Sequence, residues 1–403
     1  MNRGAEYHVV AKRVPDKGDI RGEIMMDKQE NLRRYDLDWM KVIATLCVFL
    51  YHCSMFFNPF DWHVKNNELN STVILAFSLM VGTWIMPVFF VVSGISSYYS
   101  LQKRQMGIYL KERFIRLGIP LLFGVFILSP PQVFLERVYN HQFKGSFLDF
   151  IPHAFEGVYL EIGGSGNFAF FGLHLWYLLA LLLFSLLTSY VFGKTGACRK
   201  VTMIHLLILQ AVIILVSVYI ETVHLGGWDL VVYLLFFLAG YYIFSSGSLH
   251  ELLHKNFRLH LTAGVLSSIV YTTWFMKGLP PHGSPGSFLF TCLMVTASFN
   301  LILSFYALAN RHLSFSNKML RYCSEASLPF YILHQPVIVW IGFLMKDLSW
   351  PIPLKVVLLV SMSFLIIALT YHVLIRPTPF LRVLFGIKAK KRSVPLTGKA
   401  LTQ

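Results

Sequence analysis

The sequence predicts an all-α integral membrane protein, a bundle of about ten transmembrane helices with both termini in the cytoplasm. Three observations support this prediction. Of the 403 residues, 55% are hydrophobic and 14% are charged, whereas soluble proteins carry about 25% charged residues. Apolar runs of about 20 residues recur along the chain, and a helix of that length crosses the hydrocarbon core of a bilayer. Lysine and arginine gather in every second loop, which sets the orientation.

The expected spans follow one another from the first apolar run to the last. They lie near residues 39–57, 72–100, 117–138, 171–192, 201–220, 228–246, 258–276, 288–309, 325–345 and 354–375. The second span is long enough to break, and Pro87 and Gly94 are the expected places. The third is expected to end at Pro130 and Pro131, because a regular helix does not continue through two prolines.

Loop charge orients the bundle and divides the chain into three parts. The N-terminal arm, alternate loops and the C-terminal tail hold 28 of the 35 lysines and arginines, and such segments stay on the cytoplasmic side. We therefore expect a polar cytoplasmic arm at 1–32, a transmembrane domain at 33–380 and a basic cytoplasmic tail at 381–403, in the plasma (inner) membrane. The net charge of +15 then concerns topology and anionic lipids. No basic motif interleaved with aromatic residues is present, so nucleic acid is not an expected partner.

Two ionisable side chains, Lys41 and His52, lie inside the first expected span. Ionisable groups in hydrocarbon are costly and by default mark function. At about 1.5 Å per residue they are about 16 Å apart along the helix, with the lysine near the cytoplasmic face. His52 suits a general base that takes a proton from a hydroxyl, or it is a core histidine bonded to a neighbouring helix. Lys41 has the alternative of pairing with Asp38, one turn earlier, at the interface.

Arg113 and Arg116 lie where a basic loop enters the third span. Their spacing puts both guanidinium groups on one face of a helix, and arginine binds phosphate oxygens through two parallel hydrogen bonds. The pair is thus a candidate site for a cytoplasmic phosphate-bearing donor such as coenzyme A. The alternative is an anchor that contacts lipid headgroups.

Four further residues are candidates for substrate binding. Ser93 lacks the GxSxG elbow of a serine nucleophile and, next to Gly94, is expected to serve helix packing. His174 and Trp176 open the fourth span, either to stack on a sugar ring or as part of an interfacial aromatic belt. His334 lies mid-span, two residues before a proline that frees a backbone carbonyl, and lines a cavity or holds the kink. The histidines share no short ligand spacing, and the five cysteines are scattered, so no metal site is expected.

In this order, the motifs resemble the membrane-bound acyltransferase family 3, and most closely its branch that succinylates periplasmic glucans. The matching residues are Lys41 and His52, Arg113 and Arg116, Ser93 and Gly94, and the segments 35–39, 119–124, 174–177 and 331–336. Most members of the family have arginine where this chain has Lys41. That substitution keeps the charge and loses the two-pronged geometry of a guanidinium group.

The resemblance implies a transmembrane acyltransferase that moves an acetyl or succinyl group from cytoplasmic acyl-coenzyme A to a hydroxyl of an extracytoplasmic carbohydrate. Acyl-coenzyme A is then a substrate, and no permanently bound cofactor is expected. Arg113 and Arg116 would hold the coenzyme phosphates, Lys41, with Asp38 beside it, would stabilise charge near the thioester, and His52 would activate the hydroxyl.

Other classes of protein fit parts of the pattern. A transporter or flippase of a carbohydrate or lipid-linked substrate would also need broken helices, although no inverted repeat is visible. A membrane scaffold without catalytic activity would not explain why Lys41 and His52 lie inside an apolar span. Acyl transfer to an amine differs from transfer to a hydroxyl only in the acceptor.

Overall fold

The computed structural model describes residues 33–69 and 71–388, which are mostly helical. The predicted arm at 1–32 lies outside the described residues, as does the tail from residue 389. The first half contains α2 (Tyr35–Met55), α3 (Thr72–Gly82), α4 (Ile85–Leu101), α5 (Met106–Arg113), α6 (Ile119–Phe123), α7 (Ser129–Tyr139) and α8 (Phe147–Phe150). The second half contains α9 (Trp176–Leu187), α10 (Ser189–Phe192), α11 (Met203–Tyr219), α12 (Leu230–Ala239), α13 (Ser248–Lys277), α14 (Pro285–His312), α15 (Lys318–Met345), α16 (Ile352–Leu369) and α17 (Pro379–Leu384).

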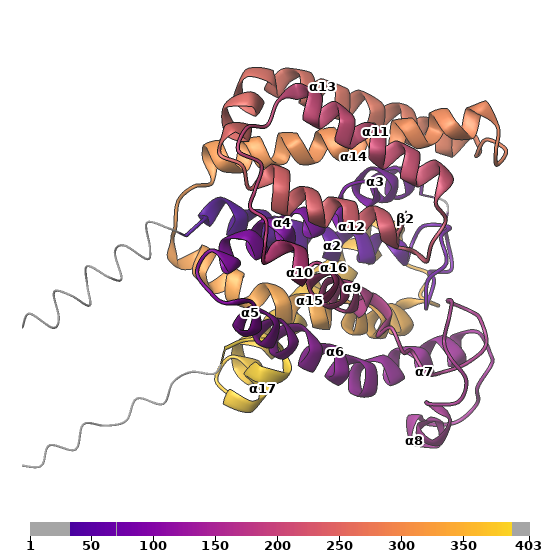
Figure 1. Ribbon diagram of the computed structural model, residues 1–403. Helices are drawn as coiled ribbons and strands as arrows, with labels where there is room; N and C mark the ends of the chain where they lie inside the picture. Colours follow the sequence, from indigo (N-terminus) through magenta and orange to yellow (C-terminus); the bar gives the residue numbers. More distant parts are fainter. Residues whose placement is uncertain (1–32, 70, 389–403) are drawn as a thin grey trace, which may run out of the picture.

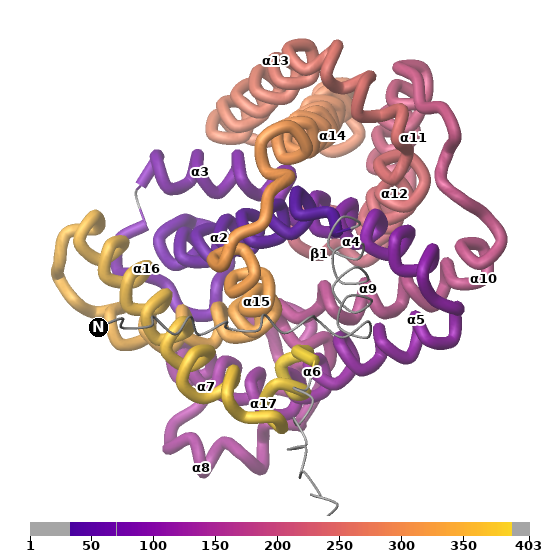
Figure 2. Tube along the Cα trace, turned by 90° about the vertical axis from the view of Figure 1, so that its left-hand side faces the viewer, coloured from indigo at the N-terminus to yellow at the C-terminus, as the bar shows by residue number. Residues whose placement is uncertain are grey.

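The long helices are arranged around α2, which lies near the middle of the bundle (Figure 2). It contacts α3, α4, α14, α15 and α16. Helices α11, α13 and α14 form one side, and α5, α6, α7 and α17 form the opposite side (Figure 1). The beginning of α2, α5 and α17 lie at one end of the bundle, on the left of Figure 1, whereas α8 and the short β2 (Trp228–Asp229), which pairs with β1 (His224–Leu225), lie at the other end. The expected boundary at residue 380 falls within α17.

Several helical stretches are long and apolar enough to cross a membrane, which makes this a multi-pass membrane protein. Five qualify singly among the described residues: Thr72–Leu101, Met106–Tyr139, Pro285–His312, Lys318–Met345 and Ile352–Ile375. Leu230–Phe244 and Ser248–Lys277 qualify together, although they are bent by 108° at their junction. Two shorter apolar stretches are Leu173–Leu187 and Met203–Tyr219. The total of about ten spans remains a prediction.

The second span breaks, but not at the expected residues. The chain leaves the helix at Thr83 and Trp84, between α3 and α4, while Pro87 sits in the first turn of α4, where its missing N–H costs little. Gly94 lies inside α4 and serves a helix crossing. A Cβ there would lie 2.1 Å from the carbonyl oxygen of Phe237 in α12, so only glycine lets the two backbones approach this closely.

The expected end of the third span at Pro130 is wrong. The helical run continues from Met106 to Tyr139 because two π-helical segments, η1 (Phe114–Gly118) and η2 (Gly124–Leu128), interrupt the α-helical bonding. Each wide turn comes just before a proline, and Pro130 then takes one of the first positions of α7, where no N–H is required. A π-turn therefore lets a membrane helix continue through proline.

Candidate active site

Three cavities lie in the described part of the chain between the two ends of the bundle. The basic cavity, of about 290 Å³, is lined mainly by α2, α4, α5, η1 and α9. The aromatic cavity, of about 310 Å³, is lined by the segments 159–174 and 224–226 and by the end of α2. Between them is a small cavity of about 40 Å³. It shares Tyr331 with the basic cavity. With the aromatic cavity it shares five lining residues, Tyr51, His52, His174, Trp176 and Gly226.

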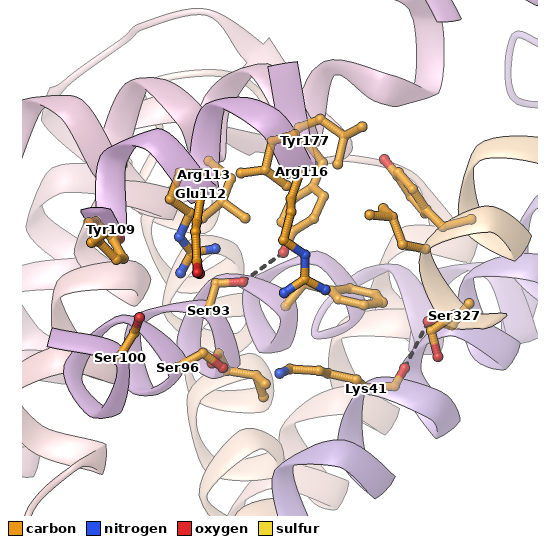
Figure 3. A pocket seen from close by; sticks show the side chains of 18 of the residues that line it. Lys41, Ser93, Ser96, Ser100, Tyr109, Glu112, Arg113, Arg116, Tyr177 and Ser327 are labelled. Atoms are coloured by element: carbon orange, nitrogen blue, oxygen red, sulfur yellow. Dashed lines mark hydrogen bonds between the residues drawn. The ribbon is translucent and has the colours of Figure 1, made fainter. Parts of the chain in front are cut away.

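The basic cavity collects the predicted cations. Figure 3 shows Arg113 and Arg116 reaching down from α5 and η1 toward Lys41 on α2. Arg113 donates a hydrogen bond to Ser97 Oγ at 2.8 Å, which fixes its guanidinium group at the cavity wall. With Arg104, four cations and one carboxylate, Glu112, line this space. The excess positive charge suits a ligand that carries phosphate groups.

Two other predicted residues of this region have different surroundings. Ser93 lines the basic cavity and is hydrogen-bonded to the Tyr177 hydroxyl at 2.7 Å, as the dashed line in Figure 3 shows. Asp38, by contrast, lines none of the three cavities. Its carboxylate pairs with Arg33 at 2.8 Å, and in the ranges 33–69 and 71–388 no carboxylate is within ion-pair distance of Lys41. Asp38 therefore lies one turn before Lys41 without an ion pair to it, and its direct ion-pair partner is Arg33; its role at the site stays a prediction.

His52 and His334 form a hydrogen-bonded pair, and their partners assign the protons. His334 Nδ1 lies 2.5 Å from the Tyr331 carbonyl oxygen and must donate to it, so neutral His334 keeps a lone pair on Nε2. That nitrogen is 2.9 Å from His52 Nδ1, which also lies 3.0 Å from the Val48 carbonyl. His52 Nδ1 is therefore the donor to both groups. Its Nε2 carries the lone pair, as a general base requires.

His174 is placed beside this pair by a proline. Pro336 has no N–H, so the Ile332 carbonyl, four residues earlier in α15, lacks its helical donor. His174 Nε2 donates to this carbonyl at 3.1 Å, and its buried Nδ1 has no hydrogen-bond partner in the described part of the chain. The ring is 6% exposed and sits 4.9 Å from His334, centroid to centroid. α15 stays helical through this region, so no break is present near His334, but the carbonyl that Pro336 frees positions a second histidine.

His334 itself is 1% exposed and lines none of the three cavities. His334 is hydrogen-bonded to His52 on the side away from the cavities, so it can orient His52 but does not face a ligand in any of the three cavities. Trp176 lines both the small and the aromatic cavity. Within the described residues, no group of three His, Cys, Asp or Glu side chains has an arrangement that could hold a metal ion.

The aromatic cavity has walls of a different character from the basic cavity. Besides four histidines, its lining includes five Tyr, Trp and Phe rings and two carboxylates: Tyr51, Trp62, Tyr159, Phe171, Trp176, Asp61 and Glu161. Aromatic faces together with hydrogen-bonding carboxylates suit a hydroxyl-rich ligand, because the rings cover the apolar face of a sugar while the carboxylates accept from its hydroxyl groups.

One wall of the aromatic cavity is held by a buried carboxylate that sequence reasoning missed. Glu136 accepts from Tyr159 at 2.8 Å and lies 2.5 Å from His63 Nδ1, and His63 Nε2 lies 2.9 Å from Gln335. Burial, and then the Glu136 carboxylate, raise the pKa of Tyr159, so that its hydroxyl stays protonated and donates. The available signal was a charged residue, Glu136, at the end of an apolar run.

Comparison with known proteins places these features in a family. Residues 34–372 match the family described as "Acyltransferase domain". The chain is 26% identical over 343 residues to "Glucans biosynthesis protein C" of Escherichia coli K12, a match that covers 77% of this chain and 83% of that protein. The protein of the same name from Shigella dysenteriae serotype 1 is 25% identical over 342 residues, with the same coverage. No solved structure matches the chain.

Proposed function

Since the chain belongs to the acyltransferase 3 family and is therefore a membrane-bound O-acyltransferase, we propose that it transfers an acyl group from acyl-coenzyme A in the basic cavity to a hydroxyl of a carbohydrate in the aromatic cavity. The observation that carries the proposal is the series of three cavities, with His52 in the wall that the small and aromatic cavities share.

The direction of transfer is part of the proposal. The basic cavity adjoins α5, at the end of the bundle where α2 begins and α17 lies (Figure 1). Positive loops at that end favour a cytoplasmic location, where acyl-coenzyme A is made. About ten crossings of the inner membrane would leave both termini in the cytoplasm, and the aromatic cavity then opens on the extracytoplasmic side.

The proposed chemistry follows from the charges and protons assigned above. Arg113 and Arg116 bind the coenzyme phosphates, and Lys41 neutralises charge on the donor as the coenzyme enters. His52 Nε2 accepts the hydroxyl proton as the oxygen attacks the thioester carbon. His334 accepts from His52 Nδ1–H and stabilises the imidazolium that forms, as the orienting group of a catalytic triad does.

Two observations support a carbohydrate as the acceptor: the lining of the aromatic cavity and the names of two relatives. The aromatic cavity fits a sugar, and two relatives carry the name of a glucan biosynthesis protein. A glucan is thus the first acceptor to test. An amine of an amino sugar would fit the same cavity, and the masses and linkages of the product would distinguish it from a hydroxyl.

The test uses the purified full-length chain in nanodiscs with labelled acetyl-coenzyme A and a glucan oligosaccharide. The wild type should label the oligosaccharide, and His52→Ala should abolish labelling while the protein still inserts and folds. His372→Ala, a histidine outside the three cavities, is the matched control and should stay active. Near wild-type labelling by His52→Ala would overturn the role of His52. The transporter alternative is tested with the same chain in sealed liposomes, where movement of unmodified oligosaccharide across the membrane without acylation would favour a transporter.

A further inference from the structure

The small cavity adjoins the place where the acyl group would be, and its lining is mostly apolar and carries no fixed charge. Its walls are Val48, Tyr51, His52, Gly82, Ile85, Met86, His174, Trp176, Gly226 and Tyr331. The thioester sulfur would approach from the basic cavity past Tyr331, and the hydroxyl from the aromatic cavity past His52. The tail of the acyl group would then face the remaining wall, which Gly82, Ile85 and Met86 form at the junction of α3 and α4.

The volume of this cavity limits the length of that tail. A water-sized group of atoms needs about 10–15 Å³ when volume is measured with a water-sized probe, so a cavity of about 40 Å³ takes about three non-hydrogen atoms. An acetyl group has three such atoms and a propionyl group has four. A succinyl group has seven, which is more than twice the number that the cavity takes.

Charge excludes the succinyl group on separate grounds. No lysine, arginine, aspartate or glutamate is among the described residues that line the small cavity, so a carboxylate placed there would lose its hydration without gaining an ion pair. The aromatic cavity offers Asp61 and Glu161, which repel a carboxylate. The cations line the basic cavity, on the other side of Tyr331.

From this geometry we propose that the small cavity selects a short, uncharged acyl group, acetyl or propionyl, and that Gly82 and Met86 set the limit. The inference rests on the proposed function and names its donor. The hydroxyl oxygen forms a bond to the thioester carbon, and the carbon–sulfur bond breaks. The hydroxyl proton passes through His52 to the departing thiolate, which leaves an ester and free coenzyme A.

The two limiting residues allow opposite changes. A Cβ at Gly82 would meet Tyr51 at 3.4 Å, an ordinary contact, so Gly82→Ala adds one methyl group to the cavity without a clash. Met86 is buried at 8% exposure, and Met86→Ala removes three non-hydrogen atoms from the wall. One methylene in an apolar pocket changes selectivity by about tenfold or more.

The experiment measures transfer to a glucan oligosaccharide by the full chain in nanodiscs, with acetyl-, propionyl-, butyryl- and succinyl-coenzyme A at equal concentrations. The wild type should prefer acetyl over butyryl and over succinyl by about tenfold or more. Gly82→Ala should lower the ratio of propionyl to acetyl transfer by about tenfold, and Met86→Ala should raise the ratio of butyryl to acetyl transfer by a similar factor. Met80→Ala, which changes a methionine outside the cavity, and Gly107→Ala, where a Cβ meets nothing within 4 Å, should leave both ratios unchanged.

The outcomes separate this inference from the function on which it rests. Transfer from succinyl-coenzyme A at a rate close to that of acetyl-coenzyme A would overturn the inference and leave the proposed function standing. So would unchanged ratios in both Gly82→Ala and Met86→Ala when the two proteins remain folded. If the folded wild type transfers no acyl group from any of the four donors, both the proposed function and this inference fail.

Discussion

Removing the acceptor nitrogen of His334 should slow catalysis without weakening substrate binding, because His334 contacts His52 and lines none of the cavities. In His334→Leu, the Nδ1–H of His52 keeps only the Val48 carbonyl at 3.0 Å, and the imidazolium formed during proton transfer loses one partner. A hydrogen bond to a group that becomes charged is worth about 1.5–3 kcal/mol. The expected loss in kcat is therefore about 10- to 150-fold.

The assay is steady-state release of coenzyme A with a glucan oligosaccharide as acceptor, and it includes two comparison variants. His334→Gln keeps a side-chain acceptor near the position of Nε2 and should recover part of the loss, whereas a purely steric role would not distinguish glutamine from leucine. His372→Leu makes the same change outside the cavities and should behave as the wild type. A kcat for His334→Leu within twofold of the wild type, or a loss confined to KM, would refute this reasoning.

Three other perturbations test the basic cavity, the buried carboxylate and the helix crossing. Lys41→Gln should raise the KM for acyl-coenzyme A by about tenfold, because the loss of about 1.4 kcal/mol of charge interaction corresponds to that factor. Lys41→Arg should keep a KM close to that of the wild type. Equal kinetics for the wild type and both variants would show that Lys41 has no role in donor binding. Glu136→Ala leaves His63 and other buried donors unpaired and should destabilise the protein by about 3 kcal/mol, seen as a lower thermal midpoint in detergent. Gly94→Ala forces the backbones of α4 and α12 apart and should lower the stability of the folded protein by about 1–3 kcal/mol. Gly107→Ala should leave the thermal midpoint unchanged. Similar thermal midpoints for both alanine variants would contradict the close crossing of the two helices.

The sequence predicted well those features that depend on hydropathy, or on one ionisable residue or proline within an apolar segment. The long apolar helices agree with the expectation. Lys41, Arg113 and Arg116 line one polar cavity, one of the two places where a cation next to hydrocarbon is expected, and their roles stay predictions. The freed carbonyl near His334 was also predictable, since a proline two residues later removes a backbone donor, although α15 stays helical there.

The remaining features depend on side-chain geometry or on contacts between segments that are distant in the chain. Asp38 forms its ion pair with Arg33, and side-chain geometry decides which nearby cation a carboxylate pairs with. The continuation of the third span past Pro130 needed π-turns, which no hydropathy pattern indicates. For His174 the sequence favoured an interfacial belt, and its partner, the Ile332 carbonyl, is 158 residues away in the chain.

The proton assignments show why one segment of α15 matters to both sides of the proposed reaction. Buried imidazole rings are costly unless their nitrogens are paired, and the backbone of α15 pairs one nitrogen of His334 and one of His174. Two lone pairs are left over, on His52 Nε2 and His174 Nδ1, and both rings line the small cavity. A junction with two acceptors and no fixed charge is complementary to a neutral hydroxyl donor. Pro336 belongs to the site for this reason, because without the carbonyl that it frees, His174 would have no fixed orientation and its lone pair would not be held at the junction.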